Sequence, residues 1–302
     1  MMKQLGVLLL AAALGFLGAA PCALAQKPPA VVKKHPATHE KAPADASEKK
    51  PAADVAAPVA SEKPAPAPSD PDHPAIEPAA LALLKASSER LAQAKSLSFV
   101  ARGAFDVPAR NGQPLFYLTR SEVLLVRPNK LRVIVPGDGP PTEFYFDGKE
   151  AAVFTPYADL IASAQVPGTL DQALEALYQK AGVYFPFVDF IVSDPYKALT
   201  DGLTSAFVIG QSKLVGDTTT DIVSISDPQV HLQIWIGTED KLPRLIWATS
   251  ADGPDKPRHS IEFSDWKLDG EDAEDAEFAP RTTASTRRIP FARPDAAQSA
   301  KP

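Results

Sequence analysis

Cysteine is almost absent from this sequence, since Cys22 is the only one among 302 residues. A single cysteine excludes an internal disulfide bond and a zinc site built from several thiolates. Histidine is also rare: of the five, only His231 and His259 lie beyond residue 75. Because thiol and imidazole groups are the commonest nucleophiles, general bases and zinc ligands, we expect no metal ion and no cofactor.

Positive charge is outnumbered by negative charge. The chain has 31 Lys and Arg against 37 Asp and Glu, for a formal net charge of −6. No part of the sequence gathers its Lys and Arg residues into a basic stripe, which is what nucleic acids and anionic membrane surfaces attract. We therefore expect no nucleic-acid partner.

The first 25 residues have the order of a secretory signal peptide. Lys3 is followed by an uncharged apolar run over residues 5–20 and then by small residues ending at Ala25. This run is shorter than the roughly 20 residues that cross a bilayer as a helix. We predict cleavage after Ala25 and a periplasmic location. Pro21 stands where a lipoprotein signal would have a small, unstrained residue, so a membrane tether through Cys22 is not expected.

Residues 26–75 differ in composition from everything after them. Eleven of these 50 residues are proline, none is aromatic, and seven lysines balance seven acidic residues. Such a segment cannot bury enough apolar surface to offset the entropy lost on ordering, so we predict a disordered linker. The remaining chain predicts one folded domain over residues 76–291, which we expect to be monomeric, and a short disordered tail over residues 292–302.

The folded part opens with an amphipathic helix, in which Leu81, Leu84, Ser88 and Leu91 recur at helical spacing. Strands follow, because the residues then alternate with a period of two or form β-rich runs bounded by turns such as Asp147-Gly148. We count about ten: residues 96–107, 115–127 and 131–135, two within 142–154, residues 204–215 and 218–226, two within 230–247, and residues 258–268.

Helical spacing returns between these two groups of strands. Thr169 and Gln172 occupy capping-box positions, and the apolar residues after them share one face. One or two short helical turns, broken by Pro186 and Pro195, are expected next. Because no strand-helix-strand alternation exists, a doubly wound parallel sheet is excluded. We predict an α+β fold: a curved antiparallel sheet, or half-barrel, covered by the N-terminal helix and a mid-chain helical lid.

Several segments resemble known families. The hairpin "LQIWIGTEDKLPRLIW" resembles that of the lipoprotein localisation factors (LolA/LolB-like). The segments "RPNKLRV", "FYFDGK", "PGTLDQALEAL", "VSDPYKALTDG" and "FSDW" are similar to an uncharacterised family of predicted periplasmic proteins, over most of residues 76–290. The LolA/LolB-like resemblance implies a half-barrel whose hydrophobic cavity holds acyl chains. The uncharacterised family supplies no catalytic residue to carry over.

Catalytic motifs find little support. His259, Ser260 and Asp265 come nearest to a Ser-His-Asp triad, yet neighbouring residues of one strand point to opposite faces. The acidic run over residues 269–277 lacks the spacing of a calcium loop and is expected to be a solvated loop.

Residues 137–139 precede two prolines and predict a tight turn, not a phosphate site. A carboxylate pair for glycoside hydrolysis needs only a separation in space, and the sequence selects none. We predict that the protein is not an enzyme.

Two alternatives remain for the apolar face of the sheet. It is either an ordinary closed core or the lining of a cavity that binds a lipid or a lipoprotein acyl chain. The candidate lining residues are Phe99, Phe105, Val133, Phe144, Phe146, Ile234, Ile236 and Phe263, and the candidate lid residues are Leu174, Leu177, Phe187 and Phe190. We take ligand binding as the working prediction. If the core is closed, the alternative prediction is an envelope scaffold or sensor that acts through an envelope protein partner.

Overall fold

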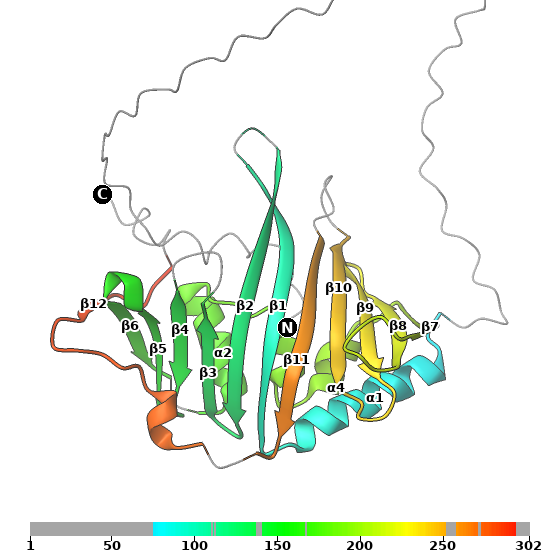
Figure 1. The fold of residues 1–302 in the computed structure, drawn as a ribbon, viewed down its shortest axis with the longest axis horizontal. Helices are drawn as coiled ribbons and strands as arrows, with labels where there is room; N and C mark the ends of the chain where they lie inside the picture. The colour runs from blue at the N-terminus through cyan, green and yellow to red at the C-terminus, as the bar shows by residue number, and fades with distance from the viewer. Residues whose placement is uncertain are drawn as a thin grey trace, which may run out of the picture. The chain divides into compact units, whose positions relative to one another are not determined.

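A computed structural model describes residues 75–293, except 110, 112, 137–140, 167, 252–257 and 271–272. The expected signal peptide, almost all of the expected linker and most of the expected tail lie outside the described residues. Within them, twelve strands form one open sheet whose two edges are β12 and β7 (Figure 1).

The strands lie in the order β12-β6-β5-β4-β3-β2-β1-β11-β10-β9-β8-β7, and neighbours are antiparallel except β12 and β6, which are parallel. The chain thus builds one meander from β1 to β6, crosses to the far edge, and returns from β7 to β11 beside β1. The bounds are β1 Ser96–Pro108, β2 Pro114–Val126, β3 Lys130–Val135, β4 Thr142–Phe146, β5 Glu150–Thr155, β6 Leu160–Gln165, β7 Ser205–Ser212, β8 Thr220–Ser226, β9 Val230–Gly237, β10 Pro243–Ser250, β11 Arg258–Leu268 and β12 Arg287–Ile289.

Four α-helices cover one face of the sheet, here called the inner face (Figure 1). Their buried side chains and the inward side chains of the strands form one hydrophobic core. No helix of the described part of the chain is both long and apolar enough to cross a membrane. The bounds are α1 Pro78–Gln93, α2 Leu170–Ala181, α3 Val188–Ile191 and α4 Pro195–Thr200, with short 3-10 helices η2 Pro156–Ala158 and η3 Asp275–Phe278.

The predicted start of the mid-chain helix is found in the structure. The side chain of Thr169 accepts a hydrogen bond from the backbone N–H of Gln172, and the Gln172 side chain accepts one from the backbone N–H of Thr169. This reciprocal capping box begins α2. Pro195 begins α4 instead of breaking a helix, because the side chain of Asp194 accepts from the backbone N–H of Lys197 at 2.9 Å. Proline fits a first helical turn since no backbone N–H is needed there.

The predicted architecture is confirmed, with two strands more than the ten expected. Asp147 and Gly148 connect β4 to β5, and Gly148 takes a φ of 95° that favours glycine. The two additional strands are β6 and β12. Strand β6 reads LIASAQ and β12 reads RRI, so neither has the β-branched or aromatic composition by which a strand is recognised from sequence.

The residues after β11 form a strap from the outer face of β3 to the helical side. Glu277 pairs with Arg132 of β3 at 2.8 Å, and Asp275 pairs with Lys130. Strand β12 then pairs with β6, after which Arg293 donates to the backbone oxygen of Tyr178 in α2 at 2.9 Å. The acidic run was expected to be a solvated loop, and the side chain of Asp275 is 90% exposed; its second half also forms η3 and these two ion pairs.

Candidate ligand-binding site

Most of the residues predicted to line a cavity lie together in the buried core. Phe99 of β1 meets Phe187 with ring centroids 5.4 Å apart, and Phe263 of β11 meets Phe190 at 5.6 Å. The helices therefore fill the middle of the inner face. The predicted residues in this core are Phe99, Val133, Phe144, Phe146, Ile234, Ile236 and Phe263 from the sheet, and Leu174, Leu177, Phe187 and Phe190 from the lid.

Phe105 is the exception, because it is half-buried and lies outside this core. Its ring stacks on Tyr117 of β2, with centroids 5.8 Å apart and planes inclined by 17°. Both residues belong to the hairpin formed by β1 and β2. The end of this hairpin, here called the arm, extends beyond the neighbouring strands (Figure 1). Phe105 thus marks where the inner face continues past its helical cover.

The sheet register places Phe105 in one transverse row of inward side chains, here called the rim row. In order across seven strands, the rim row consists of Tyr117, Phe105, His259, Ala248, Leu232, Ile225 and Ala206. Tyr117, Phe105, His259 and Leu232 are only half-buried. Apart from the imidazole of His259 and the phenol of Tyr117, the row is apolar. It is therefore a mainly apolar row along one end of the inner face, with the imidazole of His259 between Phe105 and Ala248.

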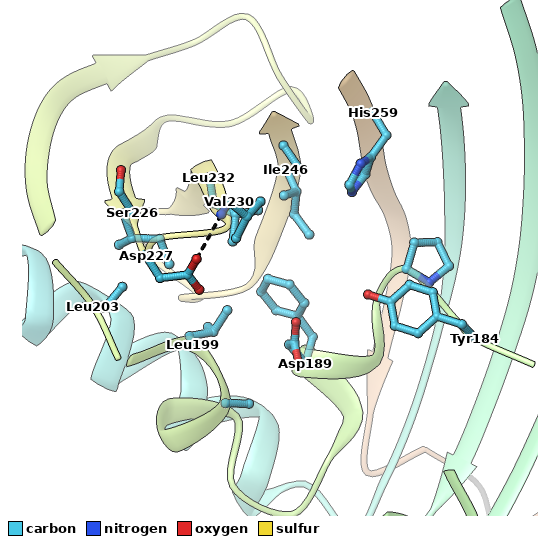
Figure 2. Close-up of a pocket in the computed structure, with 15 residues that line it drawn as sticks. Tyr184, Asp189, Leu199, Leu203, Ser226, Asp227, Val230, Leu232, Ile246 and His259 are labelled. Carbon is cyan, nitrogen blue, oxygen red and sulfur yellow. Dashed lines mark hydrogen bonds between the residues drawn. The ribbon is translucent and has the colours of Figure 1, made fainter. Parts of the chain in front are cut away.

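A cavity of about 70 Å³ lies between the rim row and the lid segment, defined here as residues 184–203. Figure 2 shows Leu232, Ile246 and His259 on the sheet side, and Leu199 and Tyr184 on the lid side. The lining residues are Tyr184, Pro186, Asp189, Phe190, Ala198, Leu199, Leu203, Ile225, Ser226, Asp227, Val230, Leu232, Ile246, Ala248 and His259. The cavity is thus mainly apolar, with a few polar groups at its wall.

These polar groups are acidic or neutral. The carboxylate of Asp227 accepts from the backbone N–H groups of Gln229 and Val230 at 2.7 and 2.8 Å, so the turn between β8 and β9 fixes its position. Burial lowers the pKa of His259, which favours the neutral imidazole. Burial, followed by the negative charge of Asp189, raises the pKa of Tyr184, which keeps the phenol protonated. Among the lining residues there is no lysine and no arginine.

The catalytic alternatives do not assemble. His259 points to the inner face, whereas Ser260 is the next residue of the strand and Asp265 is exposed with a φ of 57°. The other histidine, His231, is exposed, with its Nδ1 2.8 Å from the Ser226 hydroxyl oxygen. Within the described ranges, no three carboxylate, imidazole or thiol groups gather closely enough to hold a metal ion.

Most residues of the cavity wall were not predicted from the sequence. Tyr184 and Asp189 belong to the aromatic middle segment, but their approach to β11 depends on how that segment packs. Ala248 and Leu232 alternate correctly in their strands, yet only the register brings them beside His259. Asp227 carried a weak signal, since Asp-Pro after a strand marks a turn whose carboxylate bonds to its own backbone.

The fold and the cavity define an open, helix-covered antiparallel half-barrel with a small apolar site at its rim. The model of a family described as a predicted periplasmic protein (DUF2092) matches residues 80–292. The chain belongs to this family, which confirms the predicted resemblance. No curated protein matches the chain.

Several solved structures are similar in fold. A structure of the Pseudomonas aeruginosa MucA/MucB complex matches with 16% identity and a TM-score of 0.39, over 67% of this chain and 61% of that one. LprF from Mycobacterium bovis matches with 14% identity and a TM-score of 0.40, over 69% and 99%. The LolA superfamily protein NE2245 from Nitrosomonas europaea matches with 15% identity and a TM-score of 0.31, over 67% and 97%. The chain thus spans less than two thirds of the length of the MucB chain that it matches.

Proposed function

We propose that this protein is a non-catalytic periplasmic binding protein that holds an apolar ligand, a lipid or a lipid-modified chain, at the rim of its half-barrel. The single observation that carries the proposal is the rim row. It crosses seven neighbouring strands with mainly apolar side chains, and it passes from the cavity wall at Leu232 and Ala248 to the half-buried rings of Phe105 and Tyr117. An elongated apolar chain can follow this track.

The cavity holds only part of such a ligand in the state described. Sites for small molecules usually enclose about 300–1,000 Å³, whereas this one encloses about 70 Å³. Binding therefore requires the lid segment to move outward. Few helical hydrogen bonds oppose this movement, because α3 has four residues and α4 has six, but the buried side chains of Phe187, Phe190 and Ile191 must separate from the core for it to occur.

Burial of apolar surface supplies the binding energy in this proposal. Each methylene group transferred from water contributes about 0.8 kcal/mol, from which the cost of moving the lid and immobilising the ligand is subtracted. No catalytic group is needed. The two aromatic rings beyond the cavity, Phe105 and Tyr117, offer the largest contact area for the outer part of the chain.

The test uses dodecyl maltoside, a neutral probe, and isothermal titration calorimetry. Ala248→Phe fills the cavity from β10 and is expected to weaken binding about tenfold, since it displaces about two methylene groups. Ala104→Phe adds the same ring to the outer face of β1 and serves as the control. Leu232→Ala enlarges the site and is expected to retain binding, which keeps the test informative if Ala248→Phe does not fold. Absence of binding to the unaltered protein would overturn the proposal.

The second candidate function is that of an envelope scaffold or sensor that acts through a protein partner. It is favoured by the outer side of the arm, where Phe116 and Leu118 of β2 are 66% and 53% exposed. Exposed apolar side chains this close together commonly mark an interaction surface. Crosslinking in periplasm with and without the double change Phe116→Ser and Leu118→Ser tests this function. A partner lost only with residues 26–75 would place the contact on the linker instead.

We also propose the domain boundaries predicted from the sequence: a signal peptide over residues 1–25, a linker over residues 26–75, a folded domain over residues 76–291 and a tail over residues 292–302. The intact mass of the protein recovered from the periplasm tests the first boundary. Limited proteolysis followed by mass spectrometry tests the others, with cleavage expected before residue 76 and after residue 291. Resistance of residues 26–75 to protease would contradict the linker.

A further inference from the structure

Two neighbouring residues of the arm are exposed on opposite faces of the sheet. Phe116 of β2 is 66% exposed on the outer face, and Leu115 is 40% exposed on the inner face, which it shares with Tyr117. Farther along β2, the inward side chains of Val123 and Leu125 are buried. Both faces of the arm thus present apolar surface, and the helical cover of the inner face ends before Leu115.

The arm is a ribbon of two strands (Figure 1). The pairing of β1 with β11 ends at Phe105, and the pairing of β2 with β3 begins at Glu122. Residues 106–108 of β1 pair with residues 114–116 of β2, and no third strand of the described chain pairs with either segment. A two-stranded ribbon has little stability of its own and gains it when its apolar side chains pack against another surface. The arm therefore has the features of a contact element.

The exposure of both faces decides which kind of partner fits the arm. A protein docked on the outer face would cover Phe116 and leave Leu115 in water. A lipid bilayer surrounds an inserted element, so it removes both side chains from water at once. Asp106 is exposed and lies opposite Phe116 on the same face. Because a carboxylate enters hydrocarbon only at a large cost, the arm would enter the head-group region and stop short of the bilayer core.

We propose that the arm is a membrane-contact element whose two apolar faces insert into the head-group region of a bilayer. Strand β1 continues for three residues beyond Phe105, which is about 10 Å of extended chain. Apolar elements that lie at a bilayer interface reach a depth of about 5–10 Å. Insertion of the arm thus brings Phe105, and with it the rim row, to the bilayer surface.

This contact goes beyond the proposed function and does not depend on it. Where both hold, the rim row begins at the membrane, so an apolar ligand passes between the bilayer and the cavity with little exposure to water. The arm would then be the entrance to the ligand site.

The arm carries no basic cluster that would select anionic lipids. Among residues 105–118, the charged ones are Asp106 and Arg110, whose charges cancel. Attraction to anionic lipids requires several Lys or Arg residues near the surface and weakens as salt is added. Insertion of apolar side chains requires neither, so we expect similar binding to neutral and anionic bilayers and little effect of salt.

The experiment measures flotation of the protein recovered from the periplasm with vesicles of phosphatidylcholine, with or without phosphatidylglycerol. The unaltered protein is expected to float with both. Phe116→Ser is expected to lower the partition coefficient about tenfold, and Leu115→Ser about threefold because less of its side chain is exposed. The controls are Phe207→Ser and Ile209→Ser, which remove side chains that are 41% and 48% exposed on β7, outside the arm. Both controls are expected to float like the unaltered protein.

Three results would overturn the proposal: no flotation of the unaltered protein, flotation that requires phosphatidylglycerol, or equal losses in the arm variants and the controls. A loss in Phe116→Ser without one in Leu115→Ser would also overturn it, since only the outer face would then be in contact, as a protein partner would require.

A second measurement applies if the serine variants do not fold. Phe116→Trp and Phe207→Trp each keep an aromatic ring at an exposed position, and their fluorescence is compared in vesicles of brominated phosphatidylcholine. Quenching beyond that of the unaltered protein is expected for Phe116→Trp alone, and equal quenching of the two variants would contradict insertion of the arm. Ala248→Phe separates the two proposals, because it is expected to weaken dodecyl maltoside binding and to leave flotation unchanged.

Discussion

Two transverse rows of the same inner face differ in what covers them. The base row, Leu97, Leu125, Leu131, Phe146 and Ala151, crosses β1 to β5, and every member is at most 1% exposed. The rim row has the same inward orientation, but four of its seven members are half-buried. The alternation of the strands is the same in both rows, so the difference arises from the helices above them.

The alternation of a strand thus specifies which side chains point inward. It does not specify which helices or side chains pack against them. Phe146 in the base row belongs to the same closed core as Leu177 of α2. Phe105 in the rim row meets the ring of Tyr117, which stands on the neighbouring strand of the same sheet. A closed core and a site at its margin therefore coexist on one sheet face, and both alternatives derived from the sequence describe part of the molecule.

The largest expected contrast is between two phenylalanines. Phe187→Ala removes a fully buried ring that contacts Phe99 and Phe185 and is expected to lower the free energy of unfolding by about 3–5 kcal/mol. Phe105→Ala removes a half-buried ring and is expected to cost about 1 kcal/mol. Urea unfolding followed by tryptophan fluorescence measures both. Equal losses would mean that the rim row is as tightly covered as the core.

A smaller effect is expected at the helix that covers the base row. Thr169→Ala removes the hydroxyl that caps α2 and should lower the free energy of unfolding by about 1 kcal/mol. Thr169→Ser keeps a hydroxyl at the same position and is the control. If urea unfolding shows no loss in the alanine variant, packing of the α2 leucines would hold this helix without its cap.

The smallest effect concerns His259 in the rim row. Burial lowers the pKa of His259 below its ordinary value of 6.5. As the pH falls through about 6.5, the unfolded chain takes up a proton at this residue before the folded one does, so stability decreases over that window. His259→Gln is expected to lose less stability over the same window. Urea midpoints measured on both sides of pH 6.5 check this. If the midpoint changes with pH by the same amount in both proteins, His259 is as accessible in the folded protein as in the unfolded chain.

The elements were more predictable than the site. Asp147-Gly148, the capping box at Thr169 and the alternation in β9 are local signals, and each marks its element correctly. Strand β6 was missed because its alanines and serine look like a loop. Tyr184, Asp189 and Asp227 come together only through long-range packing and register, which no local pattern encodes. The candidate lining set therefore contained the core residues and only one member of the rim row, Phe105.

The pairing of β1 with β11 has a consequence for how the fold is completed. Leu97 of β1 lies opposite Leu268 of β11, so in the sheet the first and second meanders join through two strands that are far apart in the sequence. A chain that emerges N-terminus first holds two separate sheet fragments with open edges until Arg258 and the residues after it are released. Pairing over such distances is slow, and open edges invite aggregation. Completion of this sheet therefore waits for β11, and until then the edges of β1 and β10 that face it have no strand partner.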